Sequence, residues 1–408
     1  MPIQADLRQA IYALSDSLDL VGVDDVAHGK RVGVMAAECA RGIGWPDAEV
    51  QFAFDLGLLH DIGVSSTAMH QHLVREFDWA GSQGHAEAGH ALLCDFAPLA
   101  RMALPIRYHH VRWDAMQAHA VPPEIATLAN LVFLADRVDA VAGQYHGAGR
   151  ALRHRALIQQ EIAARAGSYF DPRWVEVFLS VSAHEAFWLQ LESRGLHGYL
   201  RAMQSIAEPY QASNGEFRAL AEIFARIVDA KSPFTVTHSR GVARVARRLA
   251  EHLGLPAGRC DELEIAGLLH DLGKLRVPDG ILDKAGRLDD EERTVMRSHS
   301  FESWQILRQI RGFEDIAAWA AHHHEAPGGA GYPFGVDAAT LPLEARILRV
   351  ADIFQAMVQD RPYRPGLSPQ AVAEFMARQR DDGQVDASVV AQLLLRLPEL
   401  YPIARLED

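Results

Sequence analysis

An apolar run that begins at Ile265 ends in the segment Leu268-Leu269-His270-Asp271-Leu272-Gly273-Lys274, which is the starting point for understanding the chain. The run is typical of a buried helix. Burying an ionisable His-Asp pair at the end of such a helix is costly unless a metal ion or a hydrogen-bond network compensates for it. The chain repeats the pattern earlier, as Leu58-Leu59-His60-Asp61-Ile62-Gly63, and the repetition favours the metal.

The two halves of the chain match over more than this dipeptide. Histidines and aspartates recur in the same order, at an offset that drifts from 210 residues between His28 and His238 to 216 residues between Asp136 and Asp352. The first set is His28, His60, Asp61, His85, His109, His110 and Asp136, and the second is His238, His270, Asp271, His299, His323, His324 and Asp352. His322 pairs with Tyr108 in this alignment, so we do not expect it to be a ligand. Matched spacing in two copies predicts a duplicated metal-binding domain.

Length and periodicity indicate two helical domains. The 408 residues are too many for one ordinary core, and 49% of them are hydrophobic. Helical periodicity recurs along both halves, with turns at Gly and Pro and no alternating β-branched segments. We therefore predict an all-α fold with an internal duplication, divided into domains 1–207 and 208–408. The pattern predicts one helix over 172–191 and another over 289–310, and the second begins with a capping box of Asp289 and Glu292. Between the two halves, the helical pattern is weaker over 196–215.

Charge and cysteine content argue against several classes of function. The formal net charge is −13, whereas a general nucleic-acid binder needs a basic surface. No apolar segment approaches the roughly 20 residues that span a bilayer, and the N-terminus lacks a signal-peptide pattern. Cys39, Cys94 and Cys260 are widely spaced, which favours reduced thiols over a disulfide framework. We expect a cytoplasmic protein that binds neither DNA, RNA nor membranes.

The second set of residues offers five imidazoles and two carboxylates, more than one ion needs. We therefore expect two divalent ions that share a bridging carboxylate, most naturally Asp271. Imidazole and carboxylate ligands without thiolate favour iron or manganese. Two such ions generate a hydroxide near neutral pH and hold the attacking and leaving oxygens of a displacement at phosphorus. Lys274 is expected to neutralise phosphate charge or to help protonate the leaving group, the alternative being a solvated surface lysine.

Four motifs of the second half resemble those of the HD-GYP phosphodiesterases, a branch of the HD superfamily. They are HDLGK (270–274), HHE (323–325), GYP (331–333) and DRPYR (360–364), and the resemblance covers about 215–408. It implies two tandem HD-type domains, of which the second hydrolyses cyclic di-GMP or, as in some members, 3′,3′-cGAMP at a bi- or trinuclear iron-type centre. It also implies that the second set of histidines and aspartates are the metal ligands, and that the substrate contacts are Lys274, Tyr332, Arg361 and Arg364.

Two positions depart from the family pattern. Gly328 stands where the family often has Asp, which puts the order of the loop and the choice of substrate in question. Phe234 stands where trinuclear members have Glu, so we expect two ions and not three.

The first half resembles an HD domain without the substrate loop. Val64 stands where the second half has Lys274, and no GYP or RPYR motif follows His110. Three hypotheses stay open for this half: an inactive domain that binds metal, a regulatory or dimer-mimicking domain without metal, and a phosphohydrolase of another specificity.

These features predict a cyclic dinucleotide phosphodiesterase in which a hydroxide bridging the metal ions opens the ring to a linear dinucleotide, with hydrolysis to mononucleotides as an extension. Asp271 and Lys274 are the predicted catalytic residues. Two alternatives are a non-catalytic cyclic-dinucleotide sensor and an HD-type hydrolase of ordinary nucleotides. The sequence leaves open whether the chain forms a homodimer or signals through a partner protein.

Overall fold

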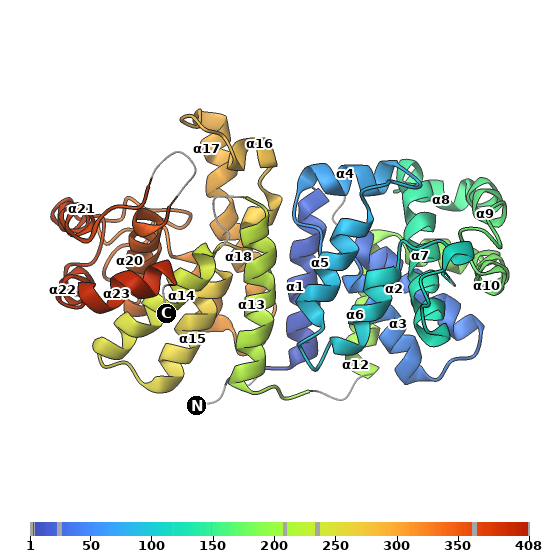
Figure 1. Ribbon diagram of the computed structural model, residues 1–408, viewed down its shortest axis with the longest axis horizontal. Coiled ribbons are helices and arrows are strands. Elements are labelled where there is room, and N and C mark those ends of the chain that lie inside the picture. Colours follow the sequence, from blue (N-terminus) through green and yellow to red (C-terminus); the bar gives the residue numbers. More distant parts are fainter. Residues whose placement is uncertain are drawn as a thin grey trace. The chain divides into compact units, whose positions relative to one another are not determined.

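The architecture is helical throughout the part of the chain that the computed structural model describes, which is residues 3, 5–22, 27–116, 118–147, 149–206, 210–232, 237–360 and 365–406. Within these residues there is no β-strand, and only two isolated bridges pair backbone segments, Asp6 with Gln211 and Ala166 with Phe170. The predicted all-α fold is confirmed (Figure 1). None of the described helices has both the length and the apolar character that a membrane span requires.

The chain separates into two units, Leu18–Glu208 and Met1–Ser17 with Pro209–Asp408. The first residues belong to the second unit, where Leu7 N donates to Tyr210 O at 3.0 Å. Helix α1 (Leu7–Asp19) therefore begins in the second unit and leads into the first. The predicted domains, 1–207 and 208–408, stay a prediction about which pieces fold independently.

The first unit is organised around α7, whose residues from Leu128 to Asp139 are all buried. Helices α2, α3, α6, α9 and α10 pack against it. The bounds are η1 (Leu20–Gly22), α2 (His28–Gly42), α3 (Asp47–Leu59), α4 (Thr67–Arg75), α5 (Gln83–Leu93), α6 (Ala100–Tyr108), η2 (Trp113–Ala115), α7 (Pro123–Ala142), η3 (Gly143–Tyr145), α8 (Arg150–Arg153), α9 (Arg155–Ala163), α10 (Pro172–Ser182), α11 (Glu185–Gln190) and α12 (Ser193–Ile206).

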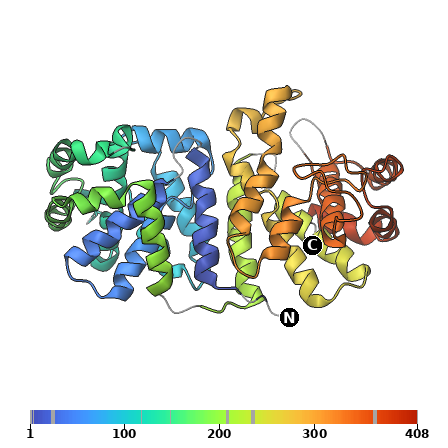
Figure 2. The ribbon, with the colours of Figure 1, turned by 180° about the vertical axis from the view of Figure 1, so that it is seen from behind.

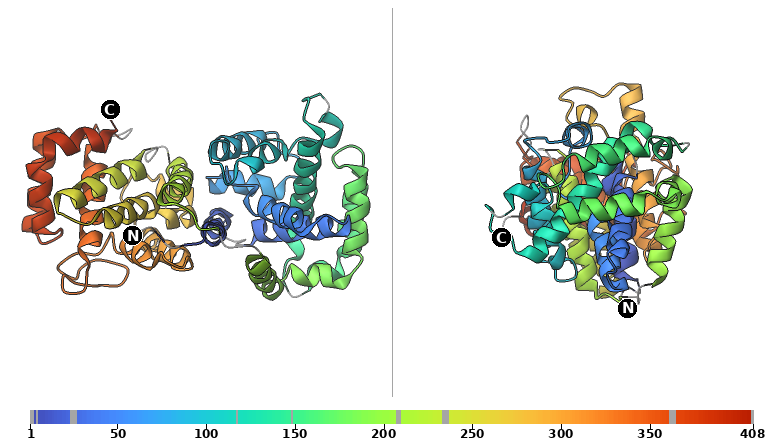
Figure 3. Two further views of the ribbon diagram at one scale, coloured as in Figure 1. Left: turned by 90° about the horizontal axis from the view of Figure 1, so that it is seen from below. Right: turned by 90° about the vertical axis from the view of Figure 1, so that its right-hand side faces the viewer.

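The second unit is organised around α14 and α15, which pack on each other and on α13 and α20. The helices at its C-terminal end, drawn in red, lie beside α20 (Figure 3). The bounds are α13 (Asn214–Ala230), α14 (His238–His252), α15 (Ala257–Leu269), η4 (Leu272–Arg276), α16 (Asp279–Leu282), α17 (Asp290–Arg297), α18 (His299–Leu307), α19 (Glu314–Ala321), α20 (Leu343–Val358), α21 (Pro369–Asp381), α22 (Ala387–Leu395) and α23 (Leu397–Arg405).

Helix α12 was not predicted, because the sequence pattern loosens over 196–215. In the structure α12 packs on α2 (Figure 2). It buries Leu196, Tyr199 and Met203, which recur at helical spacing. The poor helix formers Gly195 and Gly198 obscured this apolar face in the sequence.

Two predicted helices are each divided in the structure. The helix expected over 172–191 is interrupted between α10 and α11, where Trp188 Nε1 donates to Ser182 O at 2.8 Å. The helix expected over 289–310 is divided at Ser298, whose N–H donates to the carbonyl three residues earlier instead of four. The predicted capping box of Asp289 and Glu292 is confirmed at the start of α17.

A glycine stands two residues after the Asp of each His-Asp pair, where two segments of the chain approach each other closely. A Cβ atom on Gly273 would lie 2.1 Å from the carbonyl oxygen of His299, and one on Gly63 would lie 2.0 Å from that of His85. Only glycine permits this approach. The repeated His-Asp-X-Gly pattern thus places the His-Asp pair directly beside the helix that carries the next histidine.

Candidate metal centres

The second unit brings its predicted ligands together from five helices or helix ends. His238 opens α14, His270 and Asp271 follow α15, and His299 opens α18. His323 and His324 follow α19, and Asp352 lies within α20. They form three overlapping groups whose potential ligand atoms are mutually close: His238 with His270 and Asp352, His270 with Asp271 and His323, and His299 with His323 and His324. His322, which we did not expect to be a ligand, is in none of them.

Asp271 lies between two sets of imidazoles. Its Oδ1 atom is 3.4 Å from His299 Nε2 and 3.9 Å from His323 Nε2. Its Oδ2 atom is 3.3 Å from His270 Nε2 and 3.7 Å from His238 Nε2. A carboxylate with one oxygen toward each set is positioned to bridge two ions.

The imidazoles are oriented by their Nδ1 atoms. In three of them Nδ1 lies beside the carbonyl oxygen of the residue three positions earlier: His270 at 2.8 Å from Gly267, His299 at 2.6 Å from Met296 and His323 at 2.6 Å from Ala320. Because a carbonyl oxygen only accepts, each Nδ1 carries the proton and each Nε2 presents a lone pair to the centre. His238 Nδ1 is held in the same way by Gln355 Oε1 at 2.5 Å.

Unpartnered buried atoms support a metal at this place. His270 Nε2 and Asp271 Oδ1 are both buried and have no hydrogen-bond partner. Buried polar atoms are rarely left in this state, since an unpaired acceptor costs desolvation free energy. Imidazole nitrogens and carboxylate oxygens that converge at one buried place favour a bound cation. The residues therefore fit a binuclear metal centre.

The charge states of these groups also suit metal binding. Burial lowers the pKa of His299 to about 4, so its imidazole is neutral near neutral pH. Burial also lowers the pKa of His323 and of His324 well below the usual value. Burial acts to raise the pKa of Asp271, but His270 and Lys274 hold it well below its usual range. Burial acts to lower the pKa of His270, but the Asp271 carboxylate raises it above its usual value, so a metal ion at His270 would take the place of a proton.

The predicted substrate contacts that the structure describes lie at this centre. Lys274 Nζ is 2.5 Å from Asp271 Oδ2, and its side chain is 20% exposed. The Tyr332 ring stacks on the imidazole of His324, with centroids 4.7 Å apart, and the guanidinium carbon of Arg297 lies over the ring, 4.3 Å from its centroid. The role of Tyr332 as a substrate contact stays a prediction. Arg361, Arg364 and Phe234 lie outside the described residues.

Two supporting residues were missed from the sequence because their roles depend on packing. Ser303 Oγ donates to the carbonyl of His270 at 2.9 Å and accepts from Gly273 N at 2.9 Å, which fixes the turn of the His-Asp pair. The fully buried Glu325 accepts from the backbone N–H groups of Phe334 and Gly335, at 2.7 and 3.1 Å. The Glu of the HHE motif thus secures the loop that carries Tyr332.

The first unit reproduces the arrangement around Asp61. Its Oδ1 atom is 3.1 Å from His85 Nε2 and 3.9 Å from His109 Nε2. Its Oδ2 atom is 3.5 Å from His60 Nε2 and 3.7 Å from His28 Nε2. His110 joins the group of Asp61, His85 and His109, and Asp136 Oδ1 is 3.4 Å from His28 Nε2. All of the predicted residues of this second candidate site are therefore brought together.

The first centre differs from the second in the position of its positively charged side chain. Val64 is buried at the position matched to Lys274. Arg137 Nη2 is instead 3.0 and 2.9 Å from the two oxygens of Asp136, and it donates to the Leu73 carbonyl at 2.9 Å. Arg137 is 2% exposed, so it is fixed in place, whereas Lys274 can reach toward solvent.

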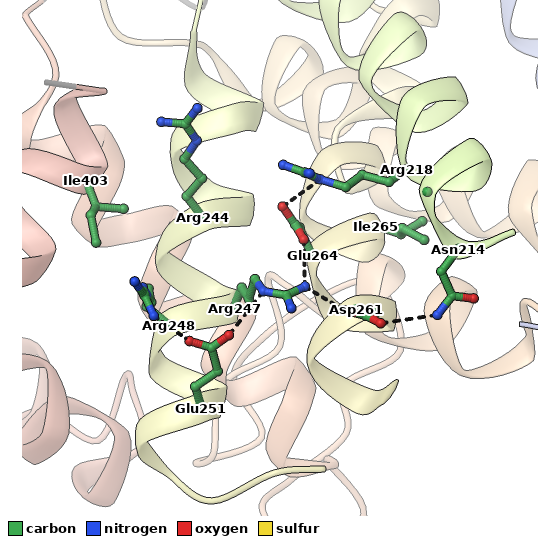
Figure 4. A pocket seen from close by; sticks show the side chains of 11 residues that line it. Asn214, Arg218, Arg244, Arg247, Arg248, Glu251, Asp261, Glu264, Ile265 and Ile403 are labelled. Carbon is green, nitrogen blue, oxygen red and sulfur yellow. Dashed lines mark hydrogen bonds and ion pairs between the residues drawn. The ribbon is translucent and has the colours of Figure 1, made fainter. Parts of the chain in front are cut away.

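A cavity of about 650 Å³ in the second unit contains many arginines but none of the metal ligands. Figure 4 shows that its charges are mostly paired with one another. Arg247 bridges Asp261 and Glu264 at 2.6 and 2.8 Å, and Arg218 pairs with Glu264 at 2.8 Å. These pairs join α13, α14 and α15, and α14 and α15 carry ligands at their ends. We interpret the cluster as a structural brace.

Comparison with known proteins agrees with the two centres. An HD domain model matches residues 26–141, and a second HD domain model matches residues 222–389. The chain is 35% identical to the 3′3′-cGAMP-specific phosphodiesterase 1 of Vibrio cholerae, over 99% of this chain and 94% of the relative. The chain belongs to the HD-GYP phosphodiesterases.

Another relative of this HD-GYP protein matches a smaller part of the chain. The cyclic di-GMP phosphodiesterase response regulator RpfG of Xanthomonas campestris is 36% identical over 38% of this chain and 42% of its own length.

The crystal structure of a cyclic GMP-AMP specific phosphodiesterase from V. cholerae superposes with a TM-score of 0.65, covering 97% of this chain and 98% of that one. At 23% identity this superposition supports the shared fold alone.

Proposed function

We propose that the chain is a metal-dependent phosphodiesterase that opens a cyclic dinucleotide to a linear dinucleotide, with 3′,3′-cGAMP as its preferred substrate and cyclic di-GMP as the second candidate. The reaction takes place at the centre around Asp271 in the second unit. The observation that supports this most strongly is the convergence of imidazole Nε2 and carboxylate oxygen atoms in three overlapping buried groups, beside Lys274. Binuclear centres of this kind serve displacement at phosphorus.

The ligands His238, His270, Asp271, His299, His323, His324 and Asp352 would hold two divalent ions, with iron or manganese favoured by donors that are imidazole and carboxylate without thiolate. When bound, these ions supply an activated water and neutralise phosphate oxygens. Asp271, with one oxygen toward each set of imidazoles, would be shared by the two ions. Lys274, held at the edge of the site by Asp271, places an ammonium where it can neutralise the phosphate and give a proton to the leaving oxygen.

The choice of 3′,3′-cGAMP follows from how far each relative extends. The relative specific for 3′3′-cGAMP matches almost the whole chain, including the first unit. The cyclic di-GMP relatives RpfG of Xanthomonas campestris and PA4108 of Pseudomonas aeruginosa match 38% and 42% of the chain. The similarity to this cGAMP relative thus extends over both HD domains of the chain and over 94% of the relative.

For the first unit we propose a supporting role without turnover of the cyclic dinucleotide. Its centre has Val64 in place of Lys274, and no counterpart of the Tyr332 loop follows His110. Metal binding by the first unit stays a prediction, and its candidate ligands are His28, His60, Asp61, His85, His109, His110 and Asp136. Cytoplasmic location, a homodimer and a signalling partner also stay predictions.

The test is turnover of 3′,3′-cGAMP and cyclic di-GMP side by side, on anaerobically purified protein with iron and manganese quantified. We expect a linear product from 3′,3′-cGAMP at a higher kcat/KM than from cyclic di-GMP. Tight binding without product, at full metal occupancy, would instead identify a cyclic-dinucleotide sensor. Hydrolysis of ordinary nucleotides alone would contradict the proposal.

A further inference from the structure

Two arginines of the second unit lie next to Tyr332 and were not among the predicted site residues. The guanidinium carbon of Arg297 lies over the Tyr332 ring, 4.3 Å from its centroid, and the same ring stacks on the candidate metal ligand His324. Arg349 lies on α20, one turn before the metal ligand Asp352. Its charge interacts with the carboxylates of Asp352 and Glu325 and with the Tyr332 hydroxyl. Both cations therefore belong to the wall of the candidate active site.

The duplicated first unit provides an internal comparison. With the offsets of the neighbouring ligands, Arg297 corresponds to Gln83 and Arg349 corresponds to Phe133. Phe133 is 1% exposed and packs near His110, and Gln83 donates to the Arg107 carbonyl at 3.0 Å. The candidate metal ligands are thus present in both copies. Arginines at the positions of Arg297 and Arg349 occur only in the copy that has Lys274. Cations that are not needed to form the centre are candidates for binding an anionic substrate.

Arg349 is a half-buried cation without a paired carboxylate. Its Nε donates to the Gln384 carbonyl at 2.7 Å, and among the described residues no carboxylate oxygen lies within 4.0 Å of the guanidinium. Burial lowers its pKa, so the site does not fully compensate for the charge. An arginine in this state has free N–H groups in a fork that matches the oxygens of a phosphate.

A cyclic dinucleotide has two phosphodiester groups, and only one is cleaved in the first step. The metal ions and Lys274 act on the scissile group, which leaves the other negative charge to be balanced elsewhere in the site. We propose that Arg349 binds the phosphate that is not cleaved, and that Arg297, held over the Tyr332 ring, stacks against a purine base. This inference rests on the proposed cyclic-dinucleotide substrate.

The geometry of Arg297 explains why a base would bind there. Its guanidinium carbon lies over the Tyr332 ring, and its side chain is exposed, so a ligand can reach the guanidinium. Guanidinium planes stack on unpaired bases, and their N–H edges match the O6 and N7 acceptors of guanine. The Tyr332 ring thus acts on the base through Arg297.

The decisive experiment compares substrates with one and two phosphates. In Arg349→Ala we expect KM for 3′,3′-cGAMP to rise about 10- to 100-fold, as for a lost charge-assisted hydrogen bond, with a much smaller change in kcat. KM for bis(p-nitrophenyl) phosphate, a diester with one phosphate, should not change. Arg349→Lys should recover part of the affinity because it restores the charge without the fork. An unchanged KM for 3′,3′-cGAMP, or equal changes for both substrates, would overturn the role of Arg349.

For Arg297 the measured quantity is the ratio of kcat/KM between 3′,3′-cGAMP and cyclic di-GMP. Arg297→Ala should change this ratio, whereas Arg293→Ala, an exposed arginine of the same helix that pairs with Asp290, should not. A constant ratio in Arg297→Ala would overturn its role in base recognition.

Calorimetric binding of 3′,3′-cGAMP to the wild type, Arg349→Ala and Arg297→Ala repeats the comparison without turnover. Weaker binding in both variants supports the inference even if the wild type proves to be a sensor. Undiminished binding in both contradicts it even if the wild type hydrolyses the ligand.

Discussion

Lys274 Nζ lies 2.5 Å from Asp271 Oδ2 in the second unit, while the matched position beside Asp61 in the first unit is the buried Val64. The ligand geometry of the two centres is otherwise nearly the same. This contact joins a partly exposed cation to the carboxylate at the middle of the centre. The capacity for catalysis is therefore expected to follow Lys274 and not the ligands alone.

The first prediction concerns Lys274. Replacing it with Met should lower kcat for 3′,3′-cGAMP about 100-fold or more, the usual cost of removing one group that stabilises transition-state charge. Metal content, measured by mass spectrometry, should stay at the wild-type level because Lys274 is not a ligand. Lys284→Met is the matched control, since Lys284 pairs with Glu292 away from the centre. Loss of metal in Lys274→Met would show that the lysine serves only to build the site.

A second prediction concerns the glycine beside each His-Asp pair. Gly273→Ala should destabilise the protein by about 2 kcal/mol or more, because its Cβ would lie 2.1 Å from a backbone oxygen that cannot move away cheaply. Chemical denaturation followed by circular dichroism gives the free energy of unfolding. Gly280→Ala is the control, since a Cβ at Gly280 meets nothing within 4 Å. Equal stability of the two variants would contradict the close approach in the structure.

The sequence was sufficient to predict the helical fold and the two sets of histidines and aspartates that come together, and the reason is the duplication. A single His-Asp pair is ambiguous, but His270 and His60 recur with the same partners at the same spacing. Spacing along the chain does not reveal which groups meet from distant segments. The bond from Ser303 to the His270 carbonyl and the contact of Arg297 with Tyr332 both depend on tertiary packing.

Helix boundaries were harder to predict for a similar reason. The division of the segment 289–310 at Ser298 places His299 at the start of α18 with its Nδ1 on the Met296 carbonyl. Nothing in the local pattern marks this break, because both sides have helical periodicity. The requirement comes from the centre, where the imidazole of His299 must face Asp271.

The reactivity of the cysteines gives a third prediction. Burial raises the pKa of the Cys39 thiol to about 12, and Cys260 is also buried with a raised pKa. The thiolate is the reactive form, so both should stay protonated and unreactive at pH 8. Cys94 is exposed. Labelling with a disulfide reagent should modify one thiol in the native protein and all three in denaturant. Rapid labelling of Cys39 in the native protein would mean that the first unit is packed differently.

The last prediction separates the two centres. His270→Ala with Asp271→Ala should abolish turnover of 3′,3′-cGAMP, a loss of more than about 1,000-fold, because both the bridging carboxylate and a ligand imidazole are removed. His60→Ala with Asp61→Ala should retain most of the turnover, since the first unit has no counterpart of Lys274 or Tyr332.

Metal analysis of the same two variants shows which centre each pair serves. The His270 and Asp271 double variant should lose the two ions expected in the second unit. Any ions that it keeps belong to the ligands around Asp61, and they should be lost when His60 and Asp61 are also replaced. Equal losses of activity in the two double variants, with both still folded by circular dichroism, would contradict the assignment of catalysis to the second unit, because a supporting domain without Lys274 should not be essential for bond cleavage.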